Sequence, residues 1–362
     1  MMNEEVKRET WKADVLRHLR AVFDELDFNH DGVIQKAELE TVMKKQSANQ
    51  PEAQIVAMLT HCYDDIQALH KESWFQSKNG ITMGDLFLLE ELLSQDALDD
   101  LSADKLKLAR AARAILKRTG EVWKLNPKLY GSDGEAETSI RPIAVRRGNV
   151  GNCFFLTALA AVARVRPGLI ATILTTNKDR SFSVCFPGLK SGGIRVERPS
   201  IVELSLYGQL TRMGYWPCVM ERAFQQVLDN ESAASMDKNP GAPLSVLTGN
   251  AIIPIKLDAN SAPRVESFLK DFMRSKRSMV LTIKTSTPDA PTHPFTVMGY
   301  EKERCRVTMR DPFGPGHISS ARELYAGQPP AKRKDGIFSL ALDAVVEHFD
   351  TIFVEDIDSD QD

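Results

Sequence analysis

Three residues between positions 153 and 311 combine a nucleophile, a base and an orienting carboxylate. Cys153 follows the glycine-bearing turn 148–151 and precedes an apolar run, which predicts that it lies at the N-terminus of a helix. There the helix dipole and unpaired N–H groups favour a thiolate and can stabilise an oxyanion. His293 precedes one predicted strand and Asp311 follows the next, so antiparallel pairing would bring both to the same sheet edge. A carboxylate beside the imidazole fixes its tautomer, which makes these three residues a candidate catalytic triad.

The segments around these residues predict a mixed α+β fold. Residues 154–165 are apolar nearly all round, as expected for a buried helix. Strands are predicted for four short runs rich in β-branched and aromatic residues, 181–186, 278–283, 295–300 and 305–310. Helical patterns dominate before His293 and strand pairs follow it, which favours a helical half followed by a sheet half.

The motifs of this region resemble, in order, those of the calpain family of cysteine peptidases. The segment from Gly151 to Ala160 resembles the G-D-C-W-F-L-A-A-L-A sequence around the calpain nucleophile. Similar matches are Arg166 to Ile170, Trp216 to Phe224, Leu247 to Gly249, His293 to Val297, Arg310 to Gly314, Gly336 to Phe338 and Val346 to Val354. The resemblance covers about residues 140–354. It implies a papain-like core of two lobes, helical over about 140–255 and sheet-containing over about 256–354. It places Cys153 on the first lobe and His293 and Asp311 on the second, and implies that calcium draws the lobes together.

Several positions depart from the calpain pattern. Asp311 stands where the family has asparagine, and a carboxylate can still accept the imidazole proton. Arg147 stands where the family has the glutamine of the oxyanion hole, six residues before the cysteine. Its guanidinium either donates to the oxyanion or forms an ion pair elsewhere and spoils the hole. Phe154 and Phe313 replace two tryptophans of the family, and the family's acidic calcium loops in the catalytic lobes find no secure match.

Residues 27–38 match a twelve-residue EF-hand loop at every diagnostic position. Oxygen ligands for a hard cation are expected from Asp27, Asn29, Asp31, the carbonyl of Val33, Gln35 through a water, and Glu38. Gly32 permits the sharp bend, and Ile34 is expected to pair with a second loop. Amphipathic patterns flank the loop on both sides, as the motif requires. The expected cofactor is therefore Ca²⁺, and the alternative is a helix-turn-helix that binds no ion.

A second, degenerate loop is predicted over residues 74–85. Residues 80–82 and Asp85 match the second half of an EF-hand loop, whereas Trp74, Gln76 and Lys78 occupy positions that need acidic ligands. A lysine at such a position repels a cation. We therefore expect this loop to be a structural partner that binds no calcium.

Residues 101–118 form a basic amphipathic pattern of the kind that an opened EF-hand groove binds. The hypothesis is an intramolecular contact between the EF-hand module and this helix, and the alternative is a solvated connecting helix. The predicted organisation is an all-α EF-hand pair over 10–98, a basic helix and linker over 99–139, with the linker from Trp123 to Ser139, the catalytic domain over 140–354, and an acidic tail over 355–362.

The overall composition indicates the class of protein and the cellular compartment. A chain of 362 residues with 43% hydrophobic and 26% charged residues is ordinary for a globular protein. Its net charge of -3 predicts no attraction to nucleic acid, and no apolar run is long enough to span a membrane. The five cysteines form no CxxC pair, and the four other than Cys153 (Cys62, Cys185, Cys218 and Cys305) are expected in the core. These features favour the reducing cytoplasm.

The sequence therefore predicts a calcium-regulated cytoplasmic cysteine endopeptidase that cleaves protein substrates. His293 would take the proton from Cys153, Asp311 would orient His293, and Arg147 or backbone N–H groups would hold the oxyanion. One alternative is a calcium-binding interaction protein with an inactive calpain-like domain, for which Arg147 is the main support. Another keeps the triad in a transamidase or deamidase that acts on glutamine.

Overall fold

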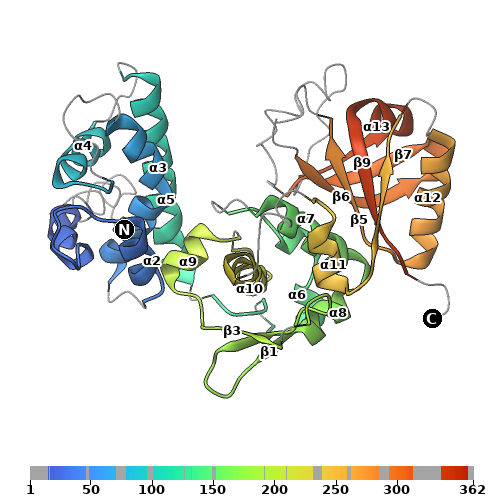
Figure 1. The fold of residues 1–362 in the computed structure, drawn as a ribbon, viewed down its shortest axis with the longest axis horizontal. Coiled ribbons are helices and arrows are strands. Elements are labelled where there is room, and N and C mark those ends of the chain that lie inside the picture. The colour runs from blue at the N-terminus through green and yellow to red at the C-terminus, as the bar shows by residue number, and fades with distance from the viewer. Residues whose placement is uncertain are drawn as a thin grey trace, which may run out of the picture. The chain divides into compact units, whose positions relative to one another are not determined.

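Helices and strands are both abundant in the computed structural model, which confirms the predicted α+β class (Figure 1). The structure describes residues 15, 17–45, 49–70, 79–95, 101–125, 127–131, 133–148, 152–190, 192–208, 210–230, 239–258, 262–284, 293–312 and 336–357. The chain divides into two compact units. The first unit comprises Met1–Pro127 and Pro199–Leu206, and the second comprises Lys128–Arg198 and Tyr207–Asp362.

The first unit is built from helices. Helical residues 17–26 precede the loop at 27–35. The helices that follow are α2 (Lys36–Met43), α3 (Gln50–His70), α4 (Met83–Ser94) and α5 (Ala103–Leu125). The two long helices α3 and α5 pack against each other. Because the apolar stripe of α5 continues from Leu108 and Ile115 to the buried Val122, the helix includes the first three residues of the linker predicted from Trp123.

A short segment from the middle of the chain completes this helical unit. Helix α9 (Ile201–Leu206) packs against α3 and α5. Its buried side chains are Val202, Glu203, Leu204, Ser205 and Leu206. Ser200 caps the helix, because its hydroxyl accepts from the Glu203 N–H at 3.1 Å and its own N–H donates to the Glu203 carboxylate at 2.8 Å. The Ser200 hydroxyl also donates to the Met43 carbonyl at 2.5 Å, at the end of α2.

The second unit begins with helices around a small sheet. In chain order its first elements are α6 (Ala136–Ser139), η1 (Pro142–Ala144), α7 (Cys153–Val165), α8 (Pro167–Ile173), β1 (Leu174–Thr176), β2 (Phe182–Val184), β3 (Ile194–Val196), α10 (Trp216–Asn230) and α11 (Ala242–Thr248). Helix α7 is apolar and mostly buried, as predicted. Strands β1, β2 and β3 form an antiparallel sheet in that order. The strand predicted over 181–186 is confirmed as β2, whereas β1 and β3 were not predicted, because strands of three residues are too short to show a clear alternation.

A six-stranded antiparallel sheet forms the rest of the second unit. Its strand order is β4-β9-β5-β6-β7-β8. The strands are β4 (Ile252–Lys256), β5 (Met279–Ile283), β6 (Pro294–Glu301), β7 (Arg306–Arg310), β8 (Ile337–Ala341) and β9 (Phe349–Glu355). Strands β6 and β7 are joined by the short helix η3 (Lys302–Arg304), which confirms the hairpin expected there.

Helices cover both faces of this sheet, and the alternation along β6 shows which face each helix covers. Phe295 and Val297 point into a core that also contains Val265 of α12 (Ala262–Ser275) and Val345 of α13 (Leu342–His348). Thr296, between them, donates through its hydroxyl to a carbonyl of α7. Helices α12 and α13 therefore lie on one face of the sheet, and α7 lies on the other.

Among the described residues no single helix is both long and apolar enough to cross a membrane. Helices α7 and α8 meet that length and composition only as a pair, with a bend of 117° between them.

Candidate active site and candidate calcium loop

Cys153 is the first residue of α7, and its side chain is partly buried. The Thr157 hydroxyl, one helical turn further on, donates to the Cys153 carbonyl at 2.8 Å. The preceding residue, Asn152, donates through Nδ2 to Oε1 of Gln225 on α10 at 3.1 Å. Residues 149–151 of the predicted turn lie outside the described residues. The predicted position of Cys153 at a helix N-terminus is confirmed.

Opposing influences act on the Cys153 thiol. Burial raises its pKa above the ordinary value, because desolvation disfavours the thiolate. The positive charge of Arg147 and the N–H groups of Phe154 and Cys153 lower the pKa, whereas the negative charge of Asp311 raises it. Burial is the largest influence, so in this conformation the expected preference for a thiolate is outweighed.

His293 and Asp311 meet at one edge of the six-stranded sheet, as the strand order predicts. Thr296 of β6 pairs with Arg310 of β7, which brings the start of β6 next to the end of β7. His293 Nε2 lies 3.2 Å from Asp311 Oδ1. Asp311 is only 1% exposed, and the His293 ring packs edge-on against Phe295 with the ring centroids 4.7 Å apart. The imidazole is thus held on two sides, by a carboxylate and by an aromatic ring.

The same sheet edge is hydrogen-bonded to the chain that leads to Cys153. The Arg147 N–H donates to the Pro312 carbonyl at 2.7 Å. The fully buried Arg310 donates through its guanidinium to the Val145 carbonyl at 2.5 Å. One helical turn beyond Cys153, the Thr157 carbonyl accepts from the Thr296 hydroxyl at 2.9 Å. Arg147, Cys153, His293 and Asp311, 164 residues apart in sequence at most, therefore belong to one continuous region of the second unit.

Sequence reasoning missed two residues of this region. Gln225 directly follows the segment that resembles a calpain motif, Trp216 to Phe224. No feature of the local sequence indicates that its amide is hydrogen-bonded to Asn152. Arg310 begins one of the motifs that resemble calpains, but nothing in that motif indicates its hydrogen bond to Val145, 165 positions earlier. Phe313, the replacement for a family tryptophan, lies outside the described residues.

The chain was compared with models of protein families and with curated proteins. Neither the family models nor the curated proteins match this chain. The resemblance to calpains therefore rests on the sequence motifs alone. The contact between His293 and Asp311 is a separate observation, which comes from the structure.

The loop over residues 27–38 folds around its own carboxylates. Asp27 accepts from the Asp31 N–H at 3.2 Å and from the Gly32 N–H at 2.9 Å. Glu38 accepts from the Phe28 N–H at 2.8 Å through one oxygen and from the Gln35 N–H at 2.7 Å through the other. Gly32 has a φ of 82°, which confirms that the bend needs the left-handed region that glycine enters at no steric cost.

The donor set of this loop fits a hard cation in its chemistry. Asp27 and Glu38 are 4% and 8% exposed, so two carboxylates are buried at opposite ends of one short loop. Asn29 and Gln35 both donate to Asp31 Oδ2, at 3.1 and 2.7 Å, which brings the other predicted side-chain ligands together. As the side chains stand, however, the described residues contain no group of three or more His, Cys, Asp or Glu placed to hold a metal ion. The carboxylates are directed instead to backbone N–H groups.

The second predicted loop pairs with the first. Ile34 and Ile81 form an isolated antiparallel bridge, with N–H to carbonyl distances of 2.8 and 2.9 Å. The pairing expected of Ile34 is therefore confirmed. Asp85 accepts from the Thr82 N–H at 2.6 Å and from its hydroxyl at 2.7 Å, in a capping box in which Thr82 is the N-cap of α4. Trp74, Gln76 and Lys78 lie outside the described residues.

The basic helix of residues 101–118 is part of α5 and belongs to the first unit. Lys107 pairs with Asp65 of α3 at 2.6 Å, and the Leu116 carbonyl accepts from Gln54 of α3 at 2.7 Å. Arg113 donates to the Leu92 carbonyl of α4 at 3.1 Å. The helix thus packs within the helical unit through its buried apolar residues and through these polar contacts.

The expectation that four cysteines lie in the core is half wrong. Cys62 and Cys218 are buried, but Cys185 and Cys305 are exposed. Cys185 comes directly after β2 ends at Val184. Cys305 lies in the turn before β7 with a φ of 46°, a left-handed conformation that belongs to turns and not to strand interiors. The run predicted over 181–186 extends two residues beyond β2, and the run predicted over 305–310 begins one residue before β7.

Proposed function

We propose that this chain is a calcium-regulated cysteine endopeptidase of the calpain type, acting on protein substrates in the cytoplasm. The observation that carries the proposal is the meeting of His293 Nε2 with Asp311 Oδ1 at 3.2 Å, at a sheet edge that is hydrogen-bonded to the segment before Cys153. Asp311 also acts electrostatically on the Cys153 thiol. The motif order of the calpain family is the second support.

The proposed chemistry follows from these groups. With Nε2 of His293 beside Asp311, Nδ1 is the nitrogen that takes the proton from Cys153 Sγ. The thiolate attacks the scissile carbonyl carbon, and Arg147 or the backbone N–H groups at the start of α7 stabilise the oxyanion. The peptide C–N bond breaks as His293 returns the proton to the leaving amine. Water then hydrolyses the thioester, with His293 as the base.

The calcium component of the proposal uses residues 27–38. Asp27, Asn29, Asp31, Gln35 and Glu38 would hold Ca²⁺ through their side chains, and Val33 through its carbonyl. The ion would supply positive charge that replaces the backbone N–H groups now bonded to Asp27 and Glu38. The Ile34–Ile81 bridge supports an EF-hand pair, because it joins the two loops through their backbones.

The decisive experiment is covalent labelling of the protein with an epoxide that reacts with cysteine peptidases, with and without Ca²⁺. We expect labelling at Cys153, located by mass spectrometry, and hydrolysis of a peptide mixture that is lost in Cys153→Ala. Cys185, which is exposed, is the internal reference thiol. Normal Ca²⁺ binding without labelling of Cys153 in either condition would overturn the peptidase proposal.

A second candidate function is a calcium-binding interaction protein with an inactive catalytic domain. The observation that favours it is the raised pKa of the Cys153 thiol, which burial causes. Arg147 at the position of the family's glutamine is a further support. The labelling experiment distinguishes the two candidates. Including a glutamine peptide and a primary amine in the assay tests the transamidase alternative at the same time.

A further inference from the structure

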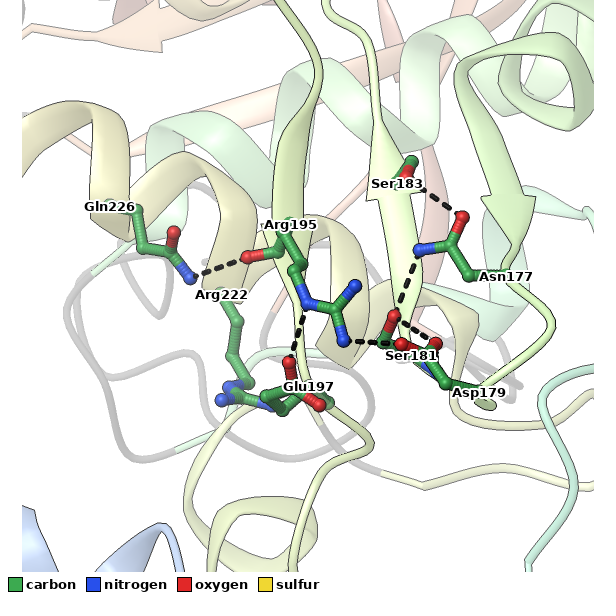
Figure 2. Close-up of polar contacts among 8 residues, drawn as sticks. All are labelled: Asn177, Asp179, Ser181, Ser183, Arg195, Glu197, Arg222 and Gln226. Atoms are coloured by element: carbon green, nitrogen blue, oxygen red, sulfur yellow. Dashed lines mark hydrogen bonds and ion pairs between the residues drawn. The ribbon is translucent and has the colours of Figure 1, made fainter.

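The 199–206 segment leaves the second unit, docks in the first and returns. Its two borders are both bonded to helix α10. Before the segment, the Glu197 carbonyl accepts from Arg222 at 2.7 Å. After it, the Gly208 N–H donates to Oε2 of Glu221 at 2.6 Å. Figure 2 shows Arg222 and Gln226 of α10 reaching towards the chain at Glu197 and Arg195.

The next turn of α10 is bonded to the residue before Cys153. Gln225 lies four positions after Glu221, so the two side chains share one face of the helix. Its Oε1 accepts from Asn152 at 3.1 Å, and its Nε2 donates to Asp229 at 2.9 Å, which fixes the orientation of the amide. The same helix stacks Phe224 on Phe155 of α7, with ring centroids 4.3 Å apart. A shift of α10 would therefore move the first turn of α7.

The 199–206 segment is hydrogen-bonded in the first unit to α2, the helix that follows the candidate calcium loop. The buried side chains of α9 lie among α3 and α5. The Ser200 hydroxyl donates to the Met43 carbonyl, at the last residue of α2. The same short helix α2 contains Glu38 in its first turn. A change at Glu38 that moves α2 would thus displace the hydrogen-bond partner of the segment.

We propose that Glu221 and Gln225 are positioning residues that couple the docking of the 199–206 segment to the placement of Asn152, and through it of Cys153. The inference rests on the proposed function in taking Cys153 as the nucleophile. Glu221 is fully buried and Arg222 nearly so, so α10 has little freedom to move independently of the two borders it binds. Undocking the segment would release both borders, and Gln225 would lose its fixed position relative to Asn152.

The test measures the alkylation rate of Cys153 by iodoacetamide, quantified by mass spectrometry against the exposed Cys185 in the same sample. Leu204→Ala weakens docking, because Leu204 is buried in α9. We expect it to change the alkylation rate of Cys153 by about threefold or more, in the full chain and in a Gln226→Ala background. In a Gln225→Ala background the same substitution should have no further effect. Gln226 is the matched control, since its amide donates to the Arg195 carbonyl.

Equal effects of Leu204→Ala in all three backgrounds would overturn the proposal, because the route would then bypass Gln225. Limited proteolysis within the segment verifies that docking has been weakened. Where Leu204→Ala leaves the segment protected, the Ser200→Ala and Leu204→Ala double variant removes the cap and the bond to Met43 as well. An unchanged Cys153 rate with the segment cleavable would also overturn the proposal.

Calcium provides an independent readout. We expect added Ca²⁺ to alter the alkylation rate of Cys153 in the full chain and in Gln226→Ala, but not in Gln225→Ala, with Ca²⁺ binding by calorimetry equal in all three. Absence of Ca²⁺ binding would overturn the calcium proposal and leave the Leu204 experiment intact. Absence of peptide hydrolysis would overturn the peptidase proposal, and alkylation would still report the coupling.

Discussion

His293 Nε2 lies 3.2 Å from Asp311 Oδ1, although 18 residues separate them in the chain. Two antiparallel strands joined by a short turn account for the meeting, because residues at the start of β6 and the end of β7 share an edge. The carboxylate is 1% exposed and therefore interacts with the imidazole with little screening by water.

Replacing Asp311 tests what the imidazole requires from its partner. We expect Asp311→Asn to lower kcat/KM for a peptide substrate by about tenfold, because an amide oxygen still accepts the imidazole N–H but carries no charge. Asp311→Ala should lower it by about a thousandfold, since the ring loses its orienting partner. Urea denaturation of both variants controls for folding. An equal loss in the two variants would show that the charge, and not the acceptor, is what His293 needs.

The pH dependence of alkylation tests the environment of Cys153. Burial raises the pKa of this thiol, so the thiolate should form only at higher pH than in an ordinary cysteine. The alkylation rate of Cys153 should therefore begin to rise at a higher pH than that of an ordinary cysteine. Because the charge of Arg147 acts to lower this pKa, Arg147→Gln should move the midpoint to still higher pH. Arg146→Gln is the matched control and should leave the midpoint in place. A midpoint that falls in Arg147→Gln would contradict the electrostatic role of Arg147.

Local patterns were sufficient to predict several of these features. The apolar run after Cys153 predicted α7, and the two β-rich runs around Glu301 predicted the hairpin that brings His293 to Asp311. Loop residues 27–38 likewise predicted the bend at Gly32 and the pairing of Ile34. In each case the relevant contacts are short-range, or follow from pairing between adjacent strands or loops.

Long-range packing was not predictable in the same way. Helix α9 has only six residues, too few for a helical period to show, and its partners α3 and α5 lie more than 75 positions earlier. The polar bond from Gln225 to Asn152 likewise has no sequence signal. Exposure of Cys185 and Cys305 depended on where the strands end, and element boundaries are poorly defined by propensity.

Substitution at the last position of each loop tests the calcium proposal. Glu38→Gln removes a charge that would close the cation site, and we expect Ca²⁺ affinity to fall by about a hundredfold. Asp85→Asn, at the corresponding position of the second loop, should leave affinity unchanged because Trp74, Gln76 and Lys78 stand where that loop would need acidic ligands. Calorimetry measures the Ca²⁺ affinity of both variants. Thermal melting is a second measurement, because Ca²⁺ at a hundred times its Kd should stabilise a variant that still binds the ion by about 2.7 kcal/mol. Loss of binding in Asp85→Asn alone would reverse the assignment.

The close contact between the two loops at Gly80 leads to a separate prediction about the stability of the fold. A Cβ added at Gly80 would lie 2.7 Å from the Val33 Cβ, so Gly80→Ala must displace one loop from the other. We expect a loss of about 1–3 kcal/mol in the free energy of unfolding, measured with urea. Gly84→Ala is the control. Its Cβ would come no closer than 3.4 Å to Thr82 and would favour α4, so stability should rise by up to about 1 kcal/mol.

Glu355 offers a test of how the second unit is held together. Its fully buried carboxylate accepts from Arg166 at the start of α8, from Asn250 at 2.7 Å and from the Ser278 N–H at 3.0 Å. Glu355→Ala leaves the partly buried Arg166 guanidinium and two further donors without their acceptor, and should lower the free energy of unfolding by about 3 kcal/mol.

An exposed ion pair in the same sheet serves as the comparison for Glu355. Lys256 and Asp350 lie 2.7 Å apart with 75% and 41% of their side chains exposed. Lys256→Ala should change the free energy of unfolding by less than about 1 kcal/mol. Equal losses in Lys256→Ala and Glu355→Ala would show that burial does not govern these pairs.

The 199–206 segment also has a consequence for synthesis and for truncation. Because α9 covers parts of α3 and α5, the helical unit lacks one of its packing elements until about residue 206 has left the ribosome. A fragment that stops at Pro127 would expose the apolar surface that Val202, Leu204 and Leu206 cover. The corresponding C-terminal fragment would carry that helix without its binding surface. Separate production of the two halves should therefore yield aggregation-prone proteins, and mixing them should restore solubility through α9.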